Sequence, residues 1–132
     1  MSDALNGVSR APKPLVIVST TGTGGDIQPF IRVAQGLCER GHRVLLLVPK
    51  FHEEAAEASG VPYETMGTRE EFQALLNNPD LWDERKGWGV IWNGVIPHLE
   101  GLRKLIQRLS AHGPCVVLSH PILVPVAALA RS

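Results

Sequence analysis

The feature that most constrains the fold is a short strand that leads through a glycine-rich turn into an amphipathic helix. Residues 15–18 read Leu-Val-Ile-Val, an unalternated and largely β-branched run typical of a parallel strand that is buried on both faces. Residues 19–25 read Ser-Thr-Thr-Gly-Thr-Gly-Gly and predict a tight turn. From Ile27 to Cys38 the apolar side chains recur at the spacing of one helical face. This order predicts the first part of a β-α-β unit.

The same pattern continues along the chain. Further strands are predicted at residues 44–48 and 115–118, both buried, and a shorter one at 61–66; helices are predicted at 51–59, 68–76, 88–109 and 122–130. We expect Pro97 to kink the long helix, and Thr68 and Glu71 to form a capping box at the start of helix 68–76. Because strands and helices alternate, the predicted fold class is α/β, a Rossmann-like parallel sheet with helices on both faces.

The two ends of the chain suggest its domain organisation. Residues 1–14 are polar and contain Pro12 and Pro14, so we expect a disordered N-terminal arm. The whole chain has 132 residues, enough for one domain and too few for two, and we assign that domain to residues 15–132. Since no strand follows the last predicted helix, we expect this domain to be incomplete, the front part of a larger α/β domain.

Composition excludes several classes of protein. Apolar residues make up 44% of the chain, which is enough for a core, and 13 basic residues balance 13 acidic ones, which argues against nucleic acid as a partner. The longest apolar run, residues 122–130, is far shorter than the roughly 20 residues that span a bilayer, and the N-terminus has no secretory signal. Cys38 and Cys115 lie in no CxxC motif and are expected to be buried thiols. We therefore expect a cytoplasmic protein.

The glycine-rich turn favours a ligand site at the sheet edge, because glycines allow close approach and the helix N-terminus offers free N–H groups. A P-loop is excluded, since Gly25 is followed by Asp26 and not by the required Lys and Ser or Thr. A dinucleotide site needs an acidic residue after the second strand, where this chain has Pro49 and Lys50. A dinucleotide-binding domain of an oxidoreductase, a turn without a ligand, and a non-catalytic interaction fragment remain as alternatives.

Asp26 is the most unusual residue of this turn. A carboxylate at a helix N-terminus is stabilised by the helix dipole and can cap the first turn. The same carboxylate lies at the predicted ligand edge of the sheet, where it could accept a proton from a bound hydroxyl as a general base. The residues alone leave both interpretations open.

Two stretches closely resemble the N-terminal domain of family 28 glycosyltransferases, which are two-domain enzymes of GT-B fold. They are residues 22–30, Gly-Thr-Gly-Gly-Asp-Ile-Gln-Pro-Phe, and residues 37–44, Leu-Cys-Glu-Arg-Gly-His-Arg-Val. The resemblance covers residues 15–132. It implies transfer of a hexose, with inversion, from a nucleotide-sugar to a hydroxyl of a lipid-like acceptor, with no further cofactor and no metal. It also implies a C-terminal donor domain that this chain lacks, so the chain alone is expected to be inactive.

A second resemblance narrows the donor. Residues 78–83 and 89–92 are similar to a segment of the rhamnosyltransferases of this family, which implies dTDP-rhamnose as the donor, with UDP-glucose as the alternative. Within the first motif, the resemblance implies that Asp26 is the catalytic base and that Gly22, Thr23, Gly24 and Gly25 bind substrate. Gly24 stands where other members often carry a longer residue.

His120 and two tryptophans complete the predicted site. His120 follows the fourth predicted strand and is expected at the same sheet edge as Asp26, where it would orient the carboxylate and lower its pKa; otherwise it caps the next helix or faces solvent. Trp88 and Trp92 lie one helical turn apart and are expected in the core. The resemblance offers a second role for them, as an apolar wall for the alkyl chain of the acceptor.

The remaining histidines and a basic cluster have simpler interpretations. His42 is expected to be structural, and His52, His98 and His112 to face solvent. Arg103, Lys104 and Arg108 complement the dipole of the long helix, or alternatively contact a membrane surface, which would make the protein peripheral to the inner face of the membrane.

Overall fold

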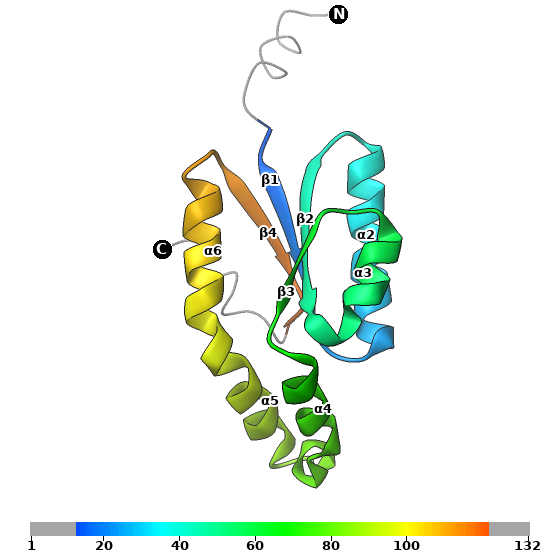
Figure 1. Ribbon diagram of the computed structural model, residues 1–132, viewed down its shortest axis with the longest axis vertical. Helices are drawn as coiled ribbons and strands as arrows, with labels where there is room; N and C mark the ends of the chain where they lie inside the picture. Colours follow the sequence, from blue (N-terminus) through cyan, green and yellow to red (C-terminus); the bar gives the residue numbers. More distant parts are fainter. Residues whose placement is uncertain (1–12, 122–132) are drawn as a thin grey trace, which may run out of the picture.

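The computed structural model describes residues 13–121, which form a four-stranded parallel sheet with helices on both faces (Figure 1). The strand order is β3-β2-β1-β4, with β1 at Leu15–Ser19, β2 at Arg43–Pro49, β3 at Tyr63–Met66 and β4 at Cys115–Ser119. The predicted α/β class and parallel sheet are therefore confirmed. The predicted helix 122–130 and nearly all of the predicted arm lie outside the described residues.

The helices are α2 (Gly24–Glu39), α3 (Glu53–Ser59), α4 (Arg69–Asn77), α5 (Gly87–Val95) and α6 (Leu99–Ser110). Short 3-10 turns lie at η1 (Lys50–His52), η2 (Pro79–Trp82) and η3 (Ile96–His98). In Figure 1, α2 and α3 cover one face of the sheet, α6 covers the other, and α4 and α5 lie beyond the C-terminal ends of the strands. This arrangement places the glycine-rich turn and the α4–α5 region at the same end of the molecule.

The long helix expected at residues 88–109 is two helices. The turn η3 separates α5 from α6 at Pro97, which has no N–H to donate and whose ring clashes with the preceding turn. The predicted kink near Pro97 is confirmed, since the backbone stays helical from α5 through the 3-10 turn η3 into α6. In Figure 1, α6 lies along the sheet and α5 extends beyond the C-terminal ends of the strands.

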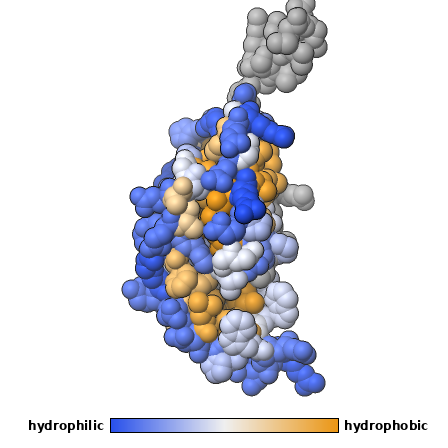
Figure 2. All heavy atoms as spheres, turned by 90° about the vertical axis from the view of Figure 1, so that its right-hand side faces the viewer, coloured by the Kyte–Doolittle hydropathy of each residue, from blue (hydrophilic) through white to orange (hydrophobic). Residues whose placement is uncertain are grey.

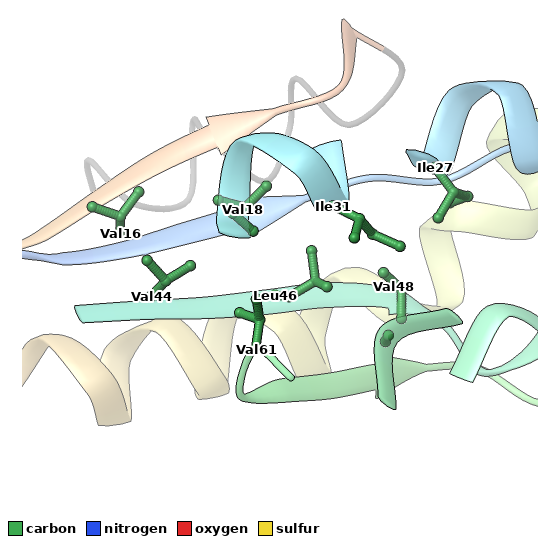
Figure 3. Close-up of a cluster of buried hydrophobic side chains, with 10 residues drawn as sticks. Val16, Val18, Ile27, Ile31, Val44, Leu46, Val48 and Val61 are labelled. Atoms are coloured by element: carbon green, nitrogen blue, oxygen red, sulfur yellow. The ribbon is translucent and has the colours of Figure 1, made fainter. Parts of the chain in front are cut away.

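Two hydrophobic clusters hold the sheet between its helices, because successive residues of a strand point to opposite faces. Ile17 and Leu47 pack against Leu102 and Ile106 of α6. The cluster on the other face, shown in Figure 3, draws on β1, β2, α2, α3 and the approach to β3: Val16, Val18, Ile27, Ile31, Ala34, Val44, Leu46, Val48, Ala56 and Val61. The two central strands are therefore buried on both sides, as their unalternated sequences predict.

The β4 strand is less buried than its sequence predicts. Val116 and Leu118 are 45% and 39% exposed, because β4 forms the edge of the described sheet. Cys38 and Cys115 are free thiols, but half-buried and not fully buried. Trp88 is 59% exposed, so the expectation that it lies in the core is wrong.

On the side of the molecule shown in Figure 2, hydrophobic patches are bordered by hydrophilic residues. Among residues 13–121, no helix combines the length and the apolar character needed to cross a bilayer.

Leu46 offers a direct test of the packing on the α2 face. Its side chain is fully buried in the central strand β2, so Leu46→Ala should leave a cavity and lower the free energy of unfolding by about 2–5 kcal/mol. Urea denaturation followed by circular dichroism measures this change. Val33→Ala, at a 48% exposed position of α2, is the control and should change stability by about 0.5 kcal/mol or less. Equal effects of the two substitutions would contradict this core.

Candidate functional site

The candidate site lies where β1 and β4 end side by side. These strands pair in parallel with Ser19 opposite Ser119, so the loops that follow them leave the sheet at the same edge. The backbone N–H of His120 donates to the Ser19 carbonyl at 2.9 Å and fixes the two loops together. Open α/β sheets bind ligands at this edge.

Asp26 belongs to the first turn of α2 and caps it. Its Oδ2 accepts hydrogen bonds from the Thr23 N–H at 3.0 Å and the Thr23 hydroxyl at 3.3 Å. Its backbone is held as well, since the Thr20 hydroxyl donates to the Asp26 carbonyl at 3.2 Å. The capping interpretation of Asp26 is therefore confirmed, and the cap holds one carboxylate oxygen in a defined position.

The other carboxylate oxygen faces His120. Asp26 Oδ1 lies 3.4 Å from His120 Nε2, and the side chains are 44% and 14% exposed, respectively. The His120 ring also packs near Phe30, with ring centroids 5.7 Å apart. The predicted proximity of Asp26 and His120 is confirmed, although they are 94 positions apart in sequence (120 − 26).

These contacts lower the pKa of the Asp26 carboxyl group. The Thr23 N–H bond lowers the pKa of Asp26 most; partial burial opposes this, and His120 lowers the pKa further. Since the ordinary value is already acidic, Asp26 is ionised at neutral pH, which is the form that can accept a proton.

The glycines of the turn have different environments. Gly22 has φ +109°, and a Cβ there would lie 2.4 Å from Asp26 Oδ2, so only glycine fits against the carboxylate. Gly24 and Gly25 are the first residues of α2 and not part of the turn, and a Cβ on either would meet nothing within 4 Å. They leave open space at the N-terminus of the helix, and Thr23 beside them is exposed.

His52, in the segment that follows β2, contacts the glycine-rich turn, and this contact was not predicted from the sequence. It was expected to face solvent, but it is half-buried in η1 and its Nε2 lies 2.7 Å from the Gly22 carbonyl oxygen. No motif marks it in the sequence. The one signal in the sequence was its place three residues after β2, at the same edge of the parallel sheet as the glycine-rich turn.

A cavity of about 550 Å³ opens beside the loop, between α4, α5 and η3. Its walls are mainly apolar, and Thr21 of the glycine-rich turn contributes to its lining. The apolar lining comprises Pro49, Met66, Phe72, Ala74, Leu75, Val90, Ile91, Val95, Pro97 and Leu102. This size and character suit a small apolar ligand.

Trp88 and Trp92 do not line this cavity. Val90, Ile91, Gly94 and Val95 turn toward it from α5. Trp88 and Trp92 belong to the same helix, but neither is among the residues that line the cavity. Their predicted role as an acceptor wall therefore has no support from the cavity geometry, and Trp92 is half-buried elsewhere.

One polar pair interrupts the apolar wall. Glu71 Oε2 lies 2.8 Å from His98 Nε2 and links α4 to η3 across the cavity lining. The capping box predicted for α4 is only half formed: the Thr68 hydroxyl accepts the Glu71 N–H at 3.1 Å, while the Glu71 carboxylate turns to His98. His98 is thus half-buried and paired, whereas His42 and His112 have exposed side chains.

Two further features of the described part of the chain bear on its chemistry. Arg103 pairs with Glu100 on α6 and is not a free surface cation. Within residues 13–121, no group of three or more His, Cys, Asp or Glu side chains is placed to hold a metal ion.

Residues 16–119 match the sequence model of the Glycosyltransferase family 28 N-terminal domain, which is most of the chain. The chain belongs to this family. The resemblance seen in the first two motifs is therefore confirmed at family level. Membership favours a transferase over the dinucleotide-binding alternative, and β2 ends in Pro49 followed by Lys50, with no acid for a ribose.

Several proteins are similar to this family 28 domain. The sterol 3-beta-glucosyltransferase of Saccharomyces cerevisiae (strain YJM789) is 31% identical over 58 residues, which is 43% of this chain and 5% of that protein. The O-mycaminosyltylonolide 6-deoxyallosyltransferase of Streptomyces fradiae is 38% identical over 48 residues, 36% of this chain and 11% of that protein. The chain thus spans a small part of these relatives.

A solved structure shares the fold. The glycotransferase of kitacinnamycin superposes with a TM-score of 0.66 at 20% identity, over 91% of this chain and 28% of that one. At this identity the likeness concerns the fold alone, and it confirms the Rossmann-like α/β fold.

Proposed function

We propose that this family 28 domain binds the acceptor in an inverting sugar transfer from a nucleotide-sugar to a hydroxyl of an apolar acceptor. The observation that carries the proposal is the ionised Asp26 carboxylate, held by Thr23 and His120 at the ligand edge of the sheet, next to an apolar cavity. Thr21 connects the two, since it lines the cavity and lies on the loop that leads into α2, the helix that carries Asp26.

In the proposed reaction, Asp26 accepts the proton of the acceptor hydroxyl. The hydroxyl oxygen then attacks the anomeric carbon of the sugar, the bond from that carbon to the diphosphate oxygen breaks, and the nucleoside diphosphate leaves with the electron pair. His120 keeps the carboxylate in position and ionised. Gly22, Gly24 and Gly25, none of which carries a side chain, and the exposed Thr23 allow both substrates to approach.

The finer assignments belong to the same proposal. We propose a hexose donor, dTDP-rhamnose or UDP-glucose, bound mainly by a C-terminal domain, with no other cofactor. Residues 78–83 and 89–92, which resemble the rhamnosyltransferases of the family, contribute Asn78, Val90 and Ile91 to the cavity lining. The segment that carries the likeness thus touches the proposed acceptor site, which supports rhamnosyl transfer to a lipid-like acceptor.

The location of the protein is proposed from the same chemistry. An apolar acceptor would be delivered from a membrane, and a cytoplasmic protein that contacts the inner membrane surface could collect it. The exposed Trp82, Trp88 and Ile96 of the η2–α5–η3 region, 71%, 59% and 56% exposed, support such a contact.

The proposal predicts that this chain binds an acceptor but not a donor. In NMR titrations, 3-hydroxydecanoic acid should shift the amide signals of residues such as Leu75 and Gly94, because they line the cavity. UDP-glucose and dTDP-rhamnose should bind weakly or not at all, since most of the donor site is proposed to lie in the other domain. Micromolar binding of either nucleotide-sugar to this chain alone would contradict the proposed division of the two sites.

A further inference from the structure

We propose that His52 is a positioning residue that holds the glycine-rich turn, and through it Asp26, in the geometry the reaction needs. The role toward Asp26 rests on the proposed function, whereas the hold on the turn does not. His52 lies on η1, after β2, while the turn follows β1, so the contact ties together two connections at the same sheet edge.

The hydrogen bond defines which ring nitrogen carries the proton. A backbone carbonyl oxygen can only accept, so the 2.7 Å contact between His52 Nε2 and the Gly22 oxygen requires that Nε2 donates. The neutral ring is therefore held as the Nε2–H tautomer, and the protonated ring can make the same bond.

Aromatic packing holds the His52 ring in place for this bond. Phe51 and Phe72 stack with centroids 4.8 Å apart, and the His52 ring meets both edge-on, at 5.2 Å and 5.4 Å. Phe72 is buried and also lines the apolar cavity. The position of His52 Nε2 is thus fixed by aromatic packing against η1 and α4.

Gly22 is constrained by contacts on two sides. Its carbonyl is held by His52, and its Cα lies against the Asp26 carboxylate so closely that a Cβ would come within 2.4 Å of Oδ2. The unusual φ of +109° is maintained between these two contacts. Loss of the His52 bond would release the carbonyl, let the turn relax, and loosen the Thr23 N–H bond that positions Asp26 Oδ2.

Two variants and a control separate this role from simple packing. His52→Phe keeps an aromatic ring beside Phe51 and Phe72 but removes the donor, and His52→Gln places an amide N–H near the position of Nε2. His112→Phe, at an exposed histidine, is the matched control. In hydrogen exchange by NMR, the Thr23 amide should exchange about tenfold faster in His52→Phe, near the original rate in His52→Gln, and unchanged in His112→Phe.

A second readout needs no variant, which matters if His52→Phe fails to fold. In the unmodified chain at pH 8, nitrogen-15 NMR of the His52 ring should show the Nε2–H tautomer. The Nδ1–H tautomer, or equal Thr23 exchange in His52→Phe and His112→Phe, would overturn the proposal. Neither measurement uses a substrate. A failure of the positioning proposal is therefore distinguishable from a failure of the proposed function.

The catalytic consequence is measured in the longer protein that carries this domain with its donor domain. His52→Phe should lower kcat about tenfold and leave the acceptor KM near its original value, with recovery in His52→Gln. If kcat is unchanged in His52→Phe while the Thr23 amide exchanges faster as expected, the proposed effect of His52 on Asp26 is overturned. The proposed role of His52 in holding the glycine-rich turn would remain.

Discussion

In a protein that joins this domain to the proposed donor domain, Asp26→Asn is expected to lower turnover by about 10²- to 10⁴-fold without unfolding this domain. The amide oxygen of asparagine can still accept from the Thr23 N–H, so the first turn of α2 stays capped. The amide cannot accept a proton from a hydroxyl, so the proposed general base is lost. Steady-state kinetics with an apolar hydroxylated acceptor, alongside circular dichroism of this chain, measures both effects.

Glu84→Gln is the matched control for this experiment. It makes the same carboxylate-to-amide change at an exposed position away from the glycine-rich turn, and it should leave turnover unchanged. Near-original turnover in Asp26→Asn with normal circular dichroism would mean that Asp26 is only a helix cap. The proposed mechanism would then need another base.

Gly22→Ala is expected to lower both the stability of the domain and the turnover of the enzyme. The residue has φ +109°, which L side chains rarely adopt, and the new Cβ would lie 2.4 Å from Asp26 Oδ2. We expect a loss of about 1–3 kcal/mol in the free energy of unfolding from backbone strain. We also expect turnover to fall by about 10²-fold or more, since the carboxylate must move.

Gly24→Ala is the control that tests whether the effect of Gly22→Ala comes from the geometry of position 22. Gly24 is the first residue of α2, and a Cβ there would meet nothing within 4 Å. Alanine should therefore be neutral or stabilise by up to about 1 kcal/mol, because it restricts the unfolded chain. Thermal unfolding of the two variants checks the contrast in stability. Equal losses of stability at both positions would show that Gly22 is not constrained by its φ and by Asp26 in the way the structure indicates.

The general architecture could be predicted because it depends on local patterns. Unalternated apolar runs such as residues 15–18 and 44–48 need cover on both faces, and strands separated by helices connect in parallel. The burial of β4 was overestimated for the same reason. Its sequence matches the central strands, but Val116 and Leu118 lie at the edge of the described sheet, and edge position is set by strand order.

Side-chain orientation on the helices was less predictable. The spacing of Trp88 predicts a core residue, yet α5 lies beyond the ends of the strands, where Trp88 is 59% exposed and Val90 and Ile91 line the cavity. Glu71 matched a capping box, but His98 from η3 lies close enough to take its carboxylate. For Glu71, a contact between distant elements replaced the local preference.

For the candidate site, the sequence by itself determined the position of the turn and the family, and it offered the cap as one of two interpretations of Asp26. Residues 22–30 are contiguous, and the bonds between Asp26 and Thr23 are local, so their pattern carries their structure. Only the tertiary structure decided that Asp26 Oδ1 lies 3.4 Å from His120, that His52 holds the Gly22 carbonyl, and that a cavity opens beside Thr21. Those contacts join elements up to 94 residues apart (120 − 26), because parallel strands bring the loops that follow them to one edge whatever their separation in sequence.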